Sequence, residues 1–149
     1  CIRALYRASQ AGVAVELNIR GICALRPGVP GVSENINVVS IVDRFLEHSR
    51  IFSFERQDEQ WIFIGSADLM PRNLYKRVEL LAPVTEEALK DQLSDVLDRS
   101  FADNTSSWRL QPDGLWSRRT PNGSEPRNLQ RELMKVHAAR SEERAPVAG

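Results

Sequence analysis

The chain has 149 residues, of which 42% are hydrophobic and 27% are charged, a composition typical of one soluble globular domain. The formal net charge is zero, so composition provides no bulk attraction to nucleic acid or acidic lipid. No run of about 18 apolar residues occurs, so the sequence predicts no membrane span. The basic residues are 17 arginines and 3 lysines. Arginine presents a planar fork of donors that suits phosphate, although a biased base composition of the gene explains the excess equally well.

The first residue and the cysteines indicate the context of the chain. Cys1 and Cys23 do not have the spacing of a metal site, and they predict neither a disulfide framework nor a zinc site. We therefore expect a reducing, cytoplasmic environment. Because the chain begins with Cys inside a helical pattern, we expect it to be a fragment of a longer polypeptide.

The first third of the chain reads as a helix followed by strands. An apolar stripe predicts a helix over residues 2–11 that Gly12 ends. Residues 13–19 are rich in Val and predict a strand buried on both faces. The next segments are predicted as a loop, a strand and one helical turn, over residues 26–35, 37–41 and 43–47.

The middle of the chain predicts a hairpin and the clearest helix. Residues 49–55 and 60–66 read as paired strands around a polar turn. Residues 68–76 read as irregular because Pro71 interrupts them. The remaining predictions are a strand, a helix, a small hairpin, a polar loop, a second helix and a frayed end, over residues 77–84, 85–100, 108–116, 121–127, 128–139 and 141–149.

These elements predict an α/β fold in which a mixed sheet is flanked by helices and followed by a small C-terminal hairpin and helix. We expect one domain over residues 1–103. Residues 104–149 would then form a C-terminal extension packed on the same domain.

His48 lies at the start of the hairpin's first strand. Histidine titrates near neutral pH, so it can exchange a proton during phosphoryl transfer or accept the phosphoryl group itself. A hydrogen-bonded histidine without a chemical role fits the same position.

Arg20 follows the predicted buried strand, at the kind of strand end where open α/β sheets bind ligands. A cation there would stabilise the charge that develops on a transferring phosphoryl group. A surface arginine in a turn is the alternative interpretation.

Small and charged residues follow the hairpin's second strand. The Gly65-Ser66 pair permits close approach of the backbone to an anion. Asp68 could orient His48 or an arginine, and Arg72 could neutralise phosphate. Turn-forming and salt-bridging roles explain these residues equally well.

Several strings of the sequence resemble the C-terminal catalytic region of bacterial polyphosphate kinase. They are LYRASQAGV, IRGICALRPGVPGVSENI, RFLEHSRI, GSADLMPRN and RVELLAPV, and they occur in that order. The resemblance is strong over about residues 2–110. It implies a phospholipase D-like fold and reversible transfer of the terminal phosphate of ATP to polyphosphate through a phosphohistidine.

The resemblance also implies roles for individual residues. His48 corresponds to an active-site histidine that contacts the nucleotide phosphates and assists proton transfer, whereas the phosphorylated histidine belongs to a domain upstream of Cys1. Arg20 corresponds to an arginine that binds the ATP phosphates. ATP or ADP, polyphosphate, Mg²⁺ with its ligands outside this chain, the upstream domains and self-association are the expected partners. No nucleic acid is expected.

A wider resemblance connects the chain to the phospholipase D superfamily, whose signature is His, any residue, Lys, four residues, Asp and a nearby Gly-Ser. His48, Arg50 and Glu55 occupy these positions, so both charged partners are altered. Arginine is a weaker proton donor than lysine and a better phosphate fork, which favours phosphoryl transfer and leaves the role of Arg50 open. No Walker loop occurs.

Two other functions remain open at this point. A phosphodiesterase acting through His48 would need a second copy of the motif, and His137 is a poor candidate because no Gly-Ser accompanies it. A non-catalytic module that binds polyanions is compatible with the arginine excess.

Overall fold

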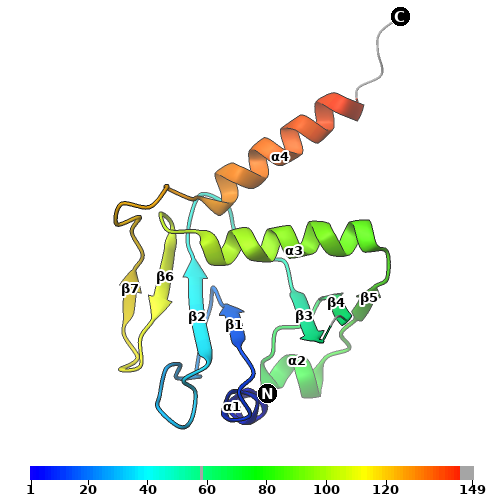
Figure 1. Ribbon diagram of the computed structural model, residues 1–149. Coiled ribbons are helices and arrows are strands. Elements are labelled where there is room, and N and C mark those ends of the chain that lie inside the picture. Colours follow the sequence, from blue (N-terminus) through cyan, green and yellow to red (C-terminus); the bar gives the residue numbers. More distant parts are fainter. Residues whose placement is uncertain (58, 145–149) are drawn as a thin grey trace, which may run out of the picture. The chain divides into compact units, whose positions relative to one another are not determined.

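The structure is a computed structural model that describes residues 1–57 and 59–144. The chain forms two compact units (Figure 1). Unit 1 combines Cys1–Phe45 with Arg99–Gly149, and unit 2 is Leu46–Asp98. The predicted domain over residues 1–103, with an extension over residues 104–149, stays a prediction.

Unit 1 contains a four-stranded mixed sheet in the order β1-β2-β6-β7. Its strands and helices are α1 (Ile2–Gln10), β1 (Val15–Asn18), β2 (Ile36–Ile41), β6 (Ser107–Leu110), β7 (Trp116–Arg118) and α4 (Leu129–Arg144). β1 and β2 are parallel, and the other two pairs are antiparallel. The predicted α/β class is confirmed, and so is the C-terminal hairpin, whose first strand pairs with β2.

The core of unit 1 lies on one face of this sheet. Leu25, Ile36, Val38 and Leu110 are buried together, and α1 packs side chains against them. β2 is the strand that is buried on both faces, because five of its six residues are buried and Asn37 is partly buried. The prediction of two buried faces for residues 13–19 is wrong. β1 is an edge strand, so its residues alternate between partly buried and exposed.

The end of α1 explains why Gly12 is needed there. Gly12 has a φ of +84°, which favours glycine, and its N–H donates to the Ser9 carbonyl at 2.9 Å. The Val13 N–H donates to the Ala8 carbonyl at 3.0 Å. These two bonds form a Schellman motif, and the predicted end of the first helix is confirmed.

A buried carboxylate organises the start of α4. Asp103 is fully buried, and its two oxygens accept bonds from the backbone N–H groups of Thr105, Ser106 and Leu129. Asn128 caps α4 by accepting a bond from the Arg131 N–H at 2.9 Å. The helix continues to Arg144, so the frayed end predicted from residue 141 is wrong as far as residue 144. Residues 145–149 lie outside the described part.

Glu132 forms ion pairs with two arginines and should make stability depend on acid pH. Its carboxylate binds Arg127 at 2.6 Å and Arg99 at 2.7 Å. These bonds, led by the one from Arg127, lower the pKa of Glu132 from 4.5 to about 2. Because the folded-state pKa is the lower one, the stabilisation is complete above about pH 4.5 and is lost as the pH falls toward 2.

We expect Glu132→Gln to lower the free energy of unfolding at neutral pH, with a difference from wild type that disappears as the pH falls toward 2. Urea titrations at several pH values measure that difference. Glu125→Gln, in an exposed loop of the same unit, is the matched control and should change stability by less than about 0.5 kcal/mol. A difference that is the same at pH 3 and pH 7 would contradict the assignment.

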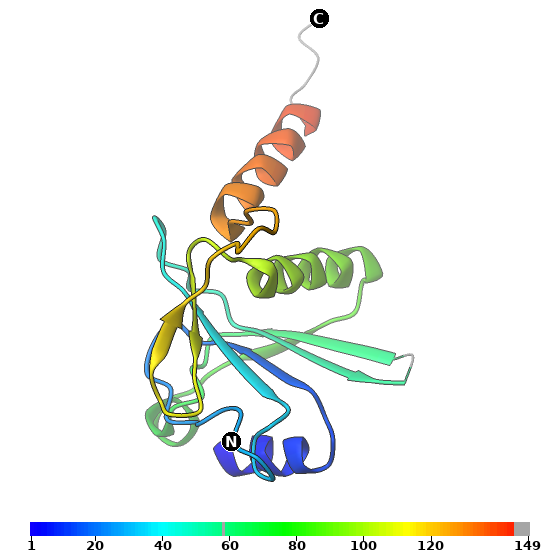
Figure 2. The ribbon, with the colours of Figure 1, turned by 60° about the vertical axis from the view of Figure 1, so that its left-hand side comes forward.

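Unit 2 contains a three-stranded antiparallel sheet in the order β3-β4-β5. Its strands and helices are β3 (Ile51–Arg56), β4 (Glu59–Gly65), α2 (Pro71–Lys76), β5 (Leu81–Val84) and α3 (Glu87–Ala102), of which α3 continues into unit 1. The predicted hairpin is confirmed, and Figure 2 shows β3 and β4 side by side. Its strands extend through Arg56 and Glu59, so the turn is tighter than predicted, and residue 58 lies outside the described part.

Several local predictions between residues 43 and 100 differ from the structure. Pro71 begins α2 instead of interrupting an irregular segment, because the first position of a helix needs no N–H donor. No helical turn forms over residues 43–47: residues 43–45 form bends, and residues 46 and 47 have no regular structure. The strand predicted over residues 77–84 is limited to Leu81–Val84, and the predicted helix begins two residues later, at Glu87.

Candidate functional site

Three of the predicted residues form one continuous hydrogen-bonded chain in unit 2. Arg50 donates from Nε and Nη2 to the same Asp68 oxygen, at 3.1 and 2.8 Å. Its Nη1 lies 2.6 Å from His48 Nδ1 and 2.5 Å from the His48 carbonyl oxygen. The antiparallel register places Ile51 opposite Ile64, which brings the segment before β3 beside the segment after β4. Asp68 therefore orients an arginine, and that arginine contacts the histidine.

The contact with Arg50 determines which imidazole nitrogen carries the proton. Arginine has N–H donors and no acceptor, so His48 Nδ1 must accept in this contact. The proton of the neutral ring is then on Nε2. Among the described residues no hydrogen bond involves Nε2, and the His48 side chain is exposed. The site thus presents an N–H donor outward from an oriented imidazole.

The bonds of Arg50 also define its role. A guanidinium has five N–H groups. The contacts with Asp68 and His48 use four of them in the described structure. Only 17% of the Arg50 side chain is exposed. Arg50 is therefore placed to position His48 rather than to bind an anion with a free fork.

Ser66 belongs to a neighbouring network built around Glu79. The Ser66 hydroxyl donates to Glu79 Oε2 at 2.5 Å and accepts from the Leu80 N–H at 3.0 Å. The amide of Asn73 donates to Glu79 Oε1 at 2.8 Å. These bonds, the one from Ser66 first, lower the pKa of Glu79. Asn73 is buried, and its Oδ1 has no partner among the described residues.

Gly65 makes this arrangement possible. A Cβ at Gly65 would lie 3.0 Å from Leu81 Cδ1 and 3.1 Å from the Leu80 carbonyl oxygen. The backbone of residue 66 can therefore approach residue 80, where the Ser66 N–H donates to the Leu80 carbonyl at 3.0 Å. The Gly-Ser pair thus serves packing against the segment before β5 in this structure.

Glu79 was not identified from the sequence. It lies inside the strand predicted over residues 77–84, where a carboxylate in an otherwise apolar run is the signal that could have identified it. Only 14% of its side chain is exposed, which fits its three partners, Ser66, Asn73 and Arg77.

Two predicted arginines lie apart from these networks. Arg72 is exposed in the first turn of α2, and Arg20 is exposed just beyond the carboxyl end of β1 in unit 1. In the described part of the chain neither guanidinium forms a hydrogen bond or ion pair. Arg20 and His48 belong to different units, so the pairing of these two side chains over one anion stays a prediction.

Neither a metal cluster nor a membrane-spanning helix appears in the described residues. No group of three or more His, Cys, Asp or Glu side chains there could hold a metal ion. No described helix is both long enough and apolar enough to cross a bilayer. Both cysteines are free thiols.

Comparison with known proteins identifies related sequences over most of the chain. The family model "Polyphosphate kinase C-terminal domain 2" matches residues 1–130. The polyphosphate kinase of Rhodopirellula baltica is 55% identical over 133 residues, which are 89% of this chain and 16% of that protein. The polyphosphate kinase of Synechocystis is 56% identical over 124 residues, which are 83% of this chain and 17% of that protein.

A solved structure has the same fold. The crystal structure of polyphosphate kinase from Porphyromonas gingivalis superposes with a TM-score of 0.90 at 37% sequence identity. The match covers 95% of this chain and 22% of that one. The chain therefore spans about a fifth of the length of its relatives.

Proposed function

Because this chain belongs to the polyphosphate kinase family, we propose that it forms part of an ATP:polyphosphate phosphotransferase. The enzyme would reversibly transfer the terminal phosphate of ATP to inorganic polyphosphate. The matched region covers most of this chain and about a fifth of its relatives, so this chain would supply one part of the active site. The phosphohistidine would lie in a domain upstream of Cys1.

The oriented imidazole of His48 is the observation that carries the proposal. Asp68 holds Arg50, and Arg50 contacts His48 Nδ1 at 2.6 Å, which leaves Nε2 as the proton-bearing nitrogen on an exposed edge. An N–H in that position can donate to a phosphate oxygen and so stabilise the negative charge on it. His48 would contact the nucleotide phosphates and assist proton transfer, and it would not be the phosphorylated residue.

Arg20 would supply the second phosphate contact. Its guanidinium has no partner in the described structure and follows the carboxyl end of a strand in an α/β sheet, where ligands commonly bind. Arg72 in unit 2 also has no side-chain partner among the described residues and would neutralise phosphate there. The Ser66 hydroxyl donates its hydrogen bond to Glu79, so we assign Ser66 a supporting role in the site.

The remaining partners follow from the proposed reaction. ATP chemistry requires Mg²⁺, and we place its ligands on the nucleotide and on the rest of the polypeptide. The two free cysteines agree with a reducing cytoplasm. Self-association of the complete enzyme is part of the proposal.

The proposal predicts a positioning role for Arg50. In the complete polypeptide, Arg50→Gln should lower kcat about 10- to 100-fold and change the KM for ATP less than about 3-fold, because a misplaced His48 still lies near the phosphates. Arg50→Lys, which keeps the charge, should recover part of the rate. Steady-state synthesis of polyphosphate, measured as a function of pH, tests both variants.

Arg56→Gln is the matched control for this experiment. Arg56 is the last residue of β3, the strand that Arg50 precedes. It is exposed and forms no side-chain bond among the described residues. Its variant should keep wild-type kcat. If Arg50→Gln has wild-type kcat and an unchanged pH profile, the positioning role and the proposed function of His48 both lose their support.

A further inference from the structure

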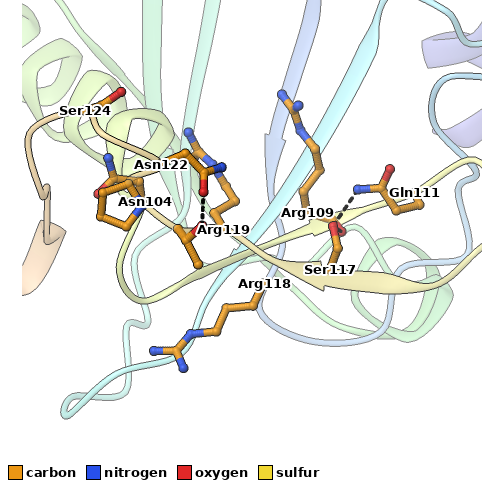
Figure 3. Close-up of a pocket in the computed structure, with 10 residues that line it drawn as sticks. Asn104, Arg109, Gln111, Ser117, Arg118, Arg119, Asn122 and Ser124 are labelled. Carbon is orange, nitrogen blue, oxygen red and sulfur yellow. Dashed lines mark hydrogen bonds between the residues drawn. The ribbon is translucent and has the colours of Figure 1, made fainter.

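A polar pocket in unit 1 is separate from the residues discussed above. Its volume is about 430 Å³, and it is lined by residues of β6 and β7, by residues that follow each of these strands, and by Asn104 before β6. None of the predicted site residues lines it. Figure 3 shows the side chains around it.

Two of the lining arginines project from the same face of the sheet. Arg109 is paired with Ser117. Arg119 follows β7, and its N–H donates to the Ser107 carbonyl at 2.9 Å, which continues the pairing with β6. The alternation of side chains along paired strands therefore places Arg109 and Arg119 on one face. In Figure 3 the side chains of Arg109 and Arg119 extend in one direction and that of Arg118 extends in another. The pocket therefore contains a pair of guanidinium groups rather than a single surface charge.

Each member of the pair is held by one hydrogen bond that leaves its other donors available. Arg109 Nε donates to Asn37 Oδ1 at 3.0 Å, and Arg119 Nη1 donates to the Phe101 carbonyl, near the end of α3, at 2.7 Å. No other hydrogen bond of either guanidinium occurs within the described ranges. Both forks are thus positioned before any ligand arrives, which reduces the entropy cost of binding.

The two arginines also repel each other. Burial lowers the pKa of Arg119, and the neighbouring charge of Arg109 lowers it further. The opposing effects of Asp103 and Glu16 are smaller, and no carboxylate lines the pocket. An anion between the two guanidinium groups would relieve this repulsion.

The rest of the lining indicates what kind of anion fits. Hydroxyl and amide side chains surround the arginines, including Ser117, Thr120 and Asn122, and Pro121 is the one apolar side chain. No aromatic side chain lines the pocket, so a nucleobase would find no ring to stack on. The pocket suits an anion that has many oxygens and no base.

Arg119 also shares a sheet edge with Arg20. β7 is antiparallel to β6, and β6 is antiparallel to β2, so β7 runs in the direction of β1 and β2. Arg20 follows β1 and Arg119 follows β7, which places both at the carboxyl edge of the four-stranded sheet. Three strand spacings separate β1 from β7, or about 14 Å.

We propose that the Arg109–Arg119 pocket binds a segment of an inorganic polyphosphate chain, as a subsite of unit 1 that does not bind the nucleotide. The choice of polyphosphate rests on the proposed function. The physical basis is a pair of positioned, mutually repelling forks in a pocket that lacks both carboxylates and stacking surfaces.

Calorimetric titration of the protein with inorganic polyphosphate, tripolyphosphate, orthophosphate and ATP at about 0.15 M salt tests the proposal, because that salt screens exposed charges beyond about 8 Å. Arg109→Gln should weaken polyphosphate binding about 10-fold and change ATP binding less than 2-fold. Arg119→Lys, which keeps the charge and loses the fork, should also weaken polyphosphate binding. Circular dichroism establishes that each variant is folded.

Arg7→Gln is the matched control. Arg7 is exposed on α1, whose Leu5 and Tyr6 pack against the core on the opposite face of the sheet, and its guanidinium has no partner in the described structure. Unchanged polyphosphate binding in folded Arg109→Gln, or an equal loss in Arg7→Gln, would overturn the proposal.

The His48→Ala variant separates this inference from the proposed function. If it transfers phosphate normally while Arg109→Gln weakens polyphosphate binding, only the catalytic role proposed for His48 is wrong. If it is inactive while Arg109→Gln binds polyphosphate like wild type, only the subsite is wrong.

Discussion

Replacing His48 with alanine is expected to lower ATP-dependent polyphosphate synthesis about 10²- to 10⁴-fold, the range typical for loss of a positioned acid–base group. The variant removes the Nε2 donor that the Arg50 contact orients toward solvent. Because the phosphohistidine would lie elsewhere, the variant should keep the residue that accepts phosphate, and ATP should phosphorylate the complete enzyme more slowly. Radiolabelled ATP distinguishes the initial phosphorylation from chain elongation.

His137→Ala is the control for this variant. His137 is exposed on α4 in unit 1, and the chain contains two histidines in total. Its replacement should leave the rate within about 2-fold of wild type, as for most surface substitutions. Full activity of His48→Ala would contradict the proposed function, and stable phosphate on His48 itself would contradict its assignment as a helper.

Replacing Arg20 with alanine should produce the second large effect, a loss of about 10²- to 10³-fold in kcat/KM for ATP. A fixed cation near the transferring group stabilises charge that spreads over its oxygens, and the guanidinium of Arg20 has no partner among the described residues to prevent that contact. Arg20→Lys should recover part of the activity, because it restores the charge without the two-pronged geometry.

Arg3→Ala provides the matched control for Arg20. Arg3 is exposed on α1 of the same unit and lacks a side-chain partner within the described ranges. Equal losses from both substitutions would mean that general charge, rather than a specific phosphate contact, explains the effect. Unchanged kcat/KM in Arg20→Ala would remove Arg20 from the site.

Elements with strong local signals were predictable from the sequence. The helix that ends at Gly12 and the hairpin of β3 and β4 depend on periodicity and turn residues within a few positions. The burial of β1 was not predictable, because it depends on which strand occupies the edge of the sheet. Pro71 shows a different limit. Proline can begin a helix or prevent one from continuing, and only the neighbouring structure distinguishes these cases.

The candidate site was predictable to a similar degree. His48 and Arg50 are two positions apart, and the hairpin register brings both close to Asp68. The direction of the bonds was not predictable, since Asp68 could have bound either neighbour. The Glu79 network depends on the packing of residue 80 against Gly65, a contact between segments that sequence spacing does not reveal.

The discontinuity of unit 1 has a consequence for biosynthesis. Its sheet pairs Ile41 of β2 with Ser107 of β6, which is 66 positions later. Unit 2 is contiguous between these strands, so a ribosome delivers all of its residues before β6 emerges. We therefore expect one edge of β2 to stay unpaired during translation until β6 has been synthesised. Pairing β6 with β2 closes the chain segment between them, and we expect that closure to be the slow step of folding.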